Sequence, residues 1–121
     1  MALNIPIQAI PNQTFNVVLG QQNCTINIWS AGYDIITNTP KSYLDLFLNN
    51  NPIYLGRKLT LTPILPYAYL QAEFIGNLIL LNNDGSTEND PNYNLFGISQ
   101  SLIYYIESDL NVLVSISNGN N

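Results

Sequence analysis

The sequence has very few of the side chains on which most enzymes and metal sites depend. Of its 121 residues none is histidine, one is cysteine (Cys24), and 9% are charged, against about a quarter in an average soluble domain. Without histidine or a second cysteine, the usual ligand sets for zinc, copper and iron are absent, and no disulfide can form within the chain. We therefore expect neither a cofactor nor a metal, and no enzyme activity.

Basic residues are the scarcest charged class. Lys41, Arg57 and Lys58 are the only three, and the net charge is -5. A chain that binds a phosphate backbone needs clustered lysine and arginine, so we expect no nucleic-acid partner and no direct base readout. The low charge has two explanations: an A/T-biased coding sequence, or a surface buried against partner chains. Coding bias would also favour lysine, so its loss favours the second.

Long apolar runs are missing as well. No stretch of about 18 apolar residues could span a bilayer, and the first residues lack the basic and apolar regions of a signal peptide. We therefore expect a protein made in the cytosol, unprocessed, with no membrane partner.

What the sequence does have favours β-strands. Phe15, Val17 and Leu19 alternate with other residues, among them the polar Asn16. A similar alternation returns over 23–29 after Gly20-Gln21-Gln22-Asn23. This pattern predicts an antiparallel hairpin with one apolar face. Further alternation or apolar runs predict strands over 43–49, 53–55, 58–62, 73–81, 101–107 and 112–116. Residues 33–40 are expected to form a short strand or a loop, and residues 82–92 a solvated loop.

No segment has a convincing 3.6-residue period. Short strands with turn signals every 8 to 12 residues instead predict a single all-β domain, an antiparallel β-barrel or β-sandwich of about seven to nine short strands.

The first residues are punctuated by proline. Pro6 and Pro11 each remove a backbone donor, so 5–11 cannot be a helix or a central strand, although the segment alternates as an extended chain would. It is an edge strand or a docking arm. We interpret 1–12 as an extended N-terminal arm, 13–107 as the core and 108–121 as a C-terminal extension. Candidate interface residues are Ile5, Pro6, Ile7, Ile10, Pro11, Tyr67 and Tyr69.

The same opening block carries a family resemblance. Its pattern Ile-Pro-x-Gln-Ala-x-Pro-Asn-Gln-x-Phe, over 5–15, resembles the cyanophage-type baseplate plug family of contractile-tailed phages. Later matching motifs extend the resemblance over roughly 5–107: Cys24 with Ile26, Asn27 and Ile28; Leu44, Asp45, Leu46 and Asn49; Phe74, Gly76 and Leu78; Asp84, Gly85, Asp90, Pro91 and Tyr93; Leu95 with Gly97; Leu102 and Tyr104. The chain departs from the family at the inserted Phe96, in a longer 33–41 segment and after residue 107.

The resemblance implies a structural virion protein. It would be a plug subunit at the distal end of the tail tube, joining tube and hub and closing the lumen. Its partners would be copies of itself and the tube, hub and other baseplate proteins, with assembly in the host cytoplasm. A low-charge chain suits such interfaces, and an extended arm suits addition to a neighbour's sheet.

Other candidate sites in the sequence have simpler interpretations. Asp34, Asp45 or Glu73 could form a carboxylate pair for glycoside hydrolysis, but each is better explained as a solvent-facing acid. Cys24 lies on the apolar hairpin face and is expected to be a core residue. Two alternatives involve larger sets: Asp84, Ser86, Glu88 and Asp90 as a calcium loop, and Trp29, Tyr33 and Tyr43 as the platform of a carbohydrate-binding, lectin-like β-sandwich.

Overall fold

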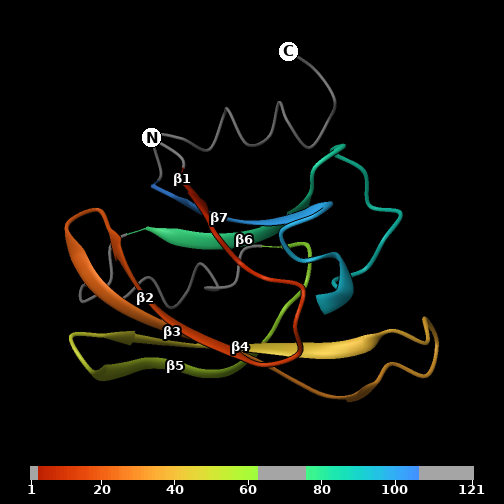
Figure 1. Ribbon diagram of the computed structural model, residues 1–121, viewed down its shortest axis with the longest axis horizontal. Helices are drawn as coiled ribbons and strands as arrows, with labels where there is room; N and C mark the ends of the chain where they lie inside the picture. The colour runs from red at the N-terminus through yellow and green to blue at the C-terminus, as the bar shows by residue number, and fades with distance from the viewer. Residues whose placement is uncertain (1–2, 63–75, 107–121) are drawn as a thin grey trace.

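The computed structural model describes residues 3–62 and 76–106. Within these ranges the chain forms seven strands in two antiparallel sheets, which lie over one another as two layers (Figure 1). One sheet has the order β1-β7-β6 and the other β2-β3-β4-β5. The bounds are Leu3–Ile5 for β1, Gln13–Leu19 for β2, Gln22–Tyr33 for β3, Pro40–Leu48 for β4, Asn51–Lys58 for β5, Asn77–Asn82 for β6 and Gln100–Tyr105 for β7, with a short 3₁₀ turn, η2, at Tyr93–Leu95. The all-β prediction is confirmed, as a sandwich, since the sheets are not closed into a barrel.

The predicted N-terminal hairpin is present. Phe15 pairs with Ile26 and Val17 with Cys24, without a break in register. The turn is shorter than predicted: Gly20 and Gln21 take it alone, with φ of 57° and 67°. Two consecutive positive φ values suit the twist of a two-residue hairpin, so the second strand starts at Gln22.

A second tight hairpin joins β4 and β5. Its turn residues Asn49 and Asn50 have φ of 50° and 68°, which asparagine tolerates better than most residues. The predicted strand at 53–55 lies within β5, which runs through two register shifts and Gly56 at φ 67°. The strand predicted at 58–62 is wrong: Lys58 is the last residue of β5, and residues 59–62 form no strand. Pro52 is accommodated because β5 is an edge strand.

The core lies between the layers. Ile26, Ile28, Leu44 and Leu46 of one sheet and Leu78, Leu80 and Leu102 of the other have no exposed surface. Each such side chain contributes about 1.5–3 kcal/mol relative to an exposed one. The predicted strand 73–81 is present as β6 from Asn77 onward. Its residues 73–75, and the whole of the predicted strand 112–116, lie outside the described residues.

The described residues at the N-terminus, 3–12, do not show an extended arm. Leu3–Ile5 pair with β7, with Ile5 opposite Leu102, and Ile5 and Ile7 are 1% and 8% exposed in the chain's own core. Of the segment 5–11, Ile5 alone lies in an edge strand, the last residue of β1, and residues 6–11 form no strand. The backbone at Ile7 packs directly against Gly97. A Cβ at Gly97, where φ is 76°, would overlap the carbonyl oxygen of Ile7.

Candidate interaction surfaces

The carboxylates considered for catalysis bind structural partners. Asp45 Oδ1 accepts a hydrogen bond from the backbone N–H of Gly56 (2.6 Å), and Asp45 Oδ2 accepts one from Asn27 Nδ2 (3.0 Å). Asp34 binds backbone groups of its own turn, and Glu73 lies outside the described residues. Cys24 is 2% exposed, and this burial raises the pKa of its thiol, so it lacks the activation that a nucleophile needs.

The calcium-loop alternative finds no support in its geometry. Asp84 Oδ1 accepts from the backbone N–H of Ser86 (2.9 Å), which lowers the pKa of Asp84, and the backbone carbonyl of Asp90 accepts from Gln100. Over 3–62 and 76–106 no three acidic, histidine or cysteine side chains gather as a metal would require.

Two of the three aromatic residues considered as a carbohydrate platform contact each other. Trp29 and Tyr43 face one another across β3 and β4, with stacked rings 4.5 Å apart and 22° between planes. Tyr33 lies beyond a register shift at the end of β3. One face of each stacked ring is therefore occupied by the other ring, as in a cross-strand pair that stabilises a sheet.

A row of hydrogen bonds crosses the outer face of the four-stranded sheet. Thr14 Oγ1 donates to Asn27 Oδ1 (2.8 Å), Asn27 donates to Asp45, and Asp45 accepts from Gly56, so β2, β3, β4 and β5 are joined in turn. Beside this row, Thr25 Oγ1 on β3 donates a hydrogen bond to Asn16 Oδ1 on β2 (2.8 Å). Polar side chains on this outer face therefore link all four strands of the sheet.

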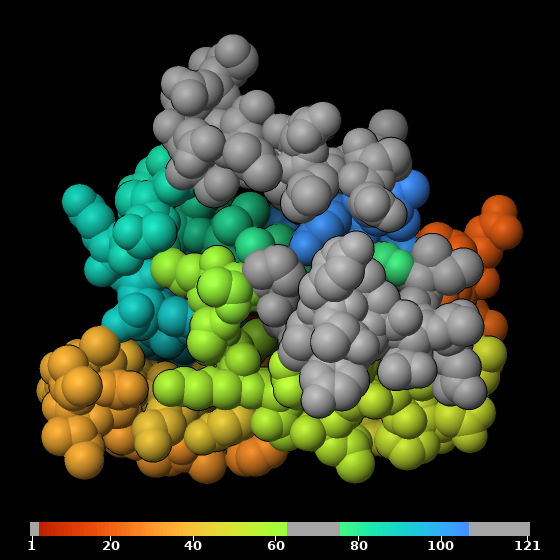
Figure 2. Space-filling view, turned by 180° about the vertical axis from the view of Figure 1, so that it is seen from behind, coloured from red at the N-terminus to blue at the C-terminus, as the bar shows by residue number. Residues whose placement is uncertain are grey.

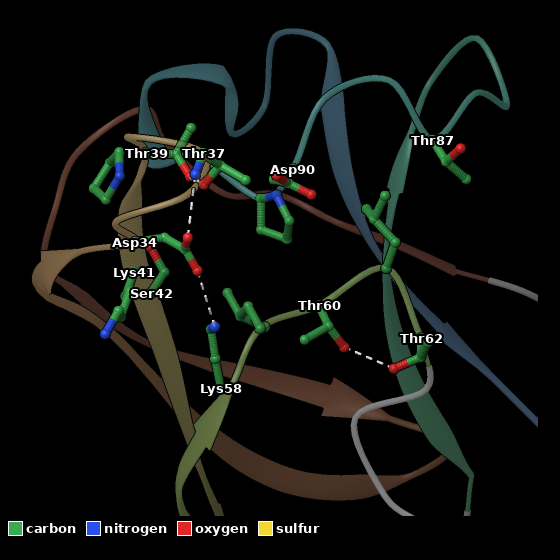
Figure 3. Close-up of a pocket in the computed structure, with 14 residues that line it drawn as sticks. Asp34, Thr37, Thr39, Lys41, Ser42, Lys58, Thr60, Thr62, Thr87 and Asp90 are labelled. Carbon is green, nitrogen blue, oxygen red and sulfur yellow. Dashed lines mark hydrogen bonds and ion pairs between the residues drawn. The ribbon is translucent and has the colours of Figure 1, made fainter.

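A pocket of about 430 Å³ lies where the 34–39 turn meets the end of β5 and the loop before η2 (Figure 3). Its polar groups are largely occupied with one another. Lys58 lies 3.8 Å from Asp34, and the hydroxyls of Thr60 and Thr62 are 2.6 Å apart. A binding site needs polar groups that converge on a ligand, and this arrangement does not supply them.

Among residues 3–62 and 76–106, the most exposed large apolar side chains lie at the β3–β4 turn. Ile35 and Ile36 are 97% and 94% exposed, and Tyr33 beside them is 61% exposed. The turn protrudes at one end of the molecule, in orange at the lower left of Figure 2. We call residues 33–39 the apolar tip. Adjacent exposed isoleucines are typical of a contact with a partner.

The apolar tip is held in one conformation by Asp34. Its Oδ1 accepts from the backbone N–H groups of Ile36 (2.9 Å) and Thr37 (3.2 Å), and its backbone carbonyl accepts from Asn38 N–H (2.8 Å). The backbone hydrogen bonds to the carboxylate lower the pKa of Asp34. A preorganised turn loses less conformational entropy when a partner binds it.

Sequence reasoning expected 33–40 to be a short strand or a loop and did not single out these isoleucines. The signal was present: two apolar residues between Gly32 and Asn38-Thr39-Pro40, with no alternation that would bury either. Of the expected interface residues, Ile5 and Ile7 are in the core, while Pro6, Ile10 and Pro11 are exposed. Tyr67 and Tyr69 lie outside the described residues.

The comparison with known families gives a match over nearly the whole chain. The family described as cyanophage baseplate Pam3 plug gp18 matches residues 2–108. The chain belongs to this family. No curated protein matches the sequence.

Membership of the plug family fixes the general role. The protein is a structural component of a phage baseplate, located in the virion tail, where it associates with other baseplate proteins. In the described residues, no helix is long and apolar enough to cross a membrane.

Proposed function

We propose that this protein is a plug subunit that joins the tail tube to the hub and closes the tube lumen. It does so by assembling with copies of itself and with neighbouring baseplate proteins, in the host cytoplasm, and not by catalysis. The observation that carries the proposal is the family match over residues 2–108.

Features of the surface support an assembly role. The apolar tip presents Ile35 and Ile36 on a braced turn, and Ile10 and Pro11 form a second exposed site before β2. Charged residues are only 9% of the chain, and protein interfaces are depleted of charge at their centres. We assign the contacts with tube and hub to these two exposed sites.

A carbohydrate-binding module is the competing function, and solution behaviour separates the two. Co-expression with the tube and hub proteins of the same phage should yield a complex that survives size-exclusion chromatography with light scattering. The purified chain should bind nothing on a glycan array. A chain that binds glycans and forms no complex with tube or hub would overturn the proposal.

A further inference from the structure

The free edge of β2 differs from the other sheet edges. Edge strands expose unpaired backbone groups, and proteins usually blunt them with short length, proline, bulges or charge. β1 has only three residues, and β5 carries Pro52, two register shifts, Arg57 and Lys58. No residue of β6 is exposed, whereas Thr14, Asn16 and Val18 of β2 all are. β2 has seven residues, no proline, no charge and no register shift.

Hairpin geometry fixes which groups of β2 are free. In a two-residue hairpin the residues that flank the turn, Leu19 and Gln22, exchange backbone hydrogen bonds, and bonding then alternates along the strand. Thr14, Asn16 and Val18 therefore direct their N–H and C=O groups away from β3. All three residues are exposed, and among the described residues none donates to or accepts from these backbone groups.

The distribution of charge along the chain favours a second copy of this protein as the partner of the β2 edge. Residues 1–33 contain no charged side chain, so all eight acids and all three bases follow Tyr33. Two copies that each carry a net charge of -5 repel one another, and the repulsion is weakest where charge is absent. β2 and its hairpin are such a region.

The sequence of β2 is also complementary to itself. An antiparallel pairing of two copies that uses all three free residues places Asn16 opposite Asn16 of the second copy, and Thr14 opposite Val18. Asn16 Oδ1 already accepts from Thr25, and its amide N–H₂ group remains available for the facing asparagine. Thr14 and Val18 would form two β-branched cross-strand pairs. On the inner face, half-buried Phe15 would lie beside Val17 of the other copy.

We propose that β2 is the self-association edge of this protein: two copies pair antiparallel through β2, centred on Asn16, and join their four-stranded sheets into one. The contact is isologous, with one two-fold axis. This inference rests on the proposed function, in which the subunit assembles with copies of itself. It identifies β2 as one of the contacts between those copies.

Charge substitutions at Asn16 test the register, because this residue faces its own counterpart. Sedimentation of the purified full chain should give a dimer or a higher even-numbered assembly. N16K and N16D alone should each weaken association by about tenfold or more, since like charges then face each other across the strands. An equal mixture of N16K and N16D should restore association, since lysine then faces aspartate.

Matched controls use Asn4, an exposed asparagine on the edge strand β1. N4K, N4D and their mixture should associate as the unmodified chain does, and all variants should keep its circular dichroism spectrum. A monomeric unmodified chain, N16K and N16D without effect, or a mixture that fails to associate would each overturn the inference. Finding the chain in purified baseplates in any of those cases would leave the proposed function standing.

Discussion

Asn82 and Gln100 form a buried side-chain hydrogen bond of 3.1 Å at the ends of the paired strands β6 and β7. Asn82 is 4% exposed and Gln100 has no exposed surface. Their remaining polar groups bind the backbone of the loop between the strands: Asn82 Nδ2 donates to the carbonyls of Ser86 and Asn89 (both 3.0 Å), and Gln100 Nε2 donates to that of Asp90 (2.8 Å). Gln100 Oε1 accepts from the N–H of Asn92 (3.0 Å).

Replacing Gln100 should therefore loosen this loop. Gln100→Leu keeps the volume but leaves Asn82 Oδ1 and Asn92 N–H without their partner, at a cost of about 1–3 kcal/mol of unfolding free energy. Backbone amide exchange should become faster over 84–92. The control is Asn89→Ala, which removes an exposed side chain and keeps the carbonyl, so its effect should stay within about 0.5 kcal/mol. Equal stability of both variants would contradict this account of the loop.

The N-terminal segment should behave as part of the core. Ile5→Ala should lower the unfolding free energy by about 2–5 kcal/mol, because Ile5 is buried opposite Leu102. Leu3→Ala on the same strand is the control, since Leu3 is 44% exposed and should cost much less. Chemical denaturation measures both. A chain that lacks residues 1–7 and unfolds at the original denaturant concentration would show that β1 contributes nothing.

The N-terminal segment and the loop also show where sequence reasoning was sufficient and where it failed. The β2–β3 hairpin was predictable because alternation and turn residues are local signals, and its pairing partner follows next in the chain. The pairing of β1 with β7 joins residues about a hundred positions apart, which no local pattern encodes. In the same way, Asn82 and Gln100 look like ordinary loop-flanking polar residues until the fold brings them together. The prediction ended one strand at residue 55 and began another at 58, whereas β5 continues through Gly56 and ends at Lys58.

Ile35 and Ile36 of the apolar tip should contribute to assembly and not to stability. A variant with both Ile35→Asn and Ile36→Asn should keep its unfolding free energy within about 0.5 kcal/mol per substitution, because both side chains are almost fully exposed. Its co-purification with tube or hub should decrease about tenfold or more. Leu55→Asn, at a 62% exposed position on β5, is the matched control. If that control lost binding as strongly as the tip variant did, the contact would not be specific to the tip.

Acid should weaken the turn that carries this tip. The N–H groups of Thr37 and Ile36 lower the pKa of Asp34 below its ordinary value of 3.8, so its ionised form is favoured in the folded chain. The resulting stabilisation is fully present above the ordinary pKa and is lost as the pH falls through the lowered one. Asp34→Ala should therefore show a smaller drop in Tm than the unmodified chain when the pH is lowered below about 4. Parallel pH dependence of the two Tm values would exclude this role.

The central claim is that this subunit closes the tail tube where it meets the hub, and electron cryomicroscopy of the intact phage particle tests it most directly. We expect density for a two-layered β-sandwich, in several copies, on the tail axis between the last tube ring and the hub. Baseplates in which this sandwich is absent from the axis, or lies only at the periphery, would contradict the claim.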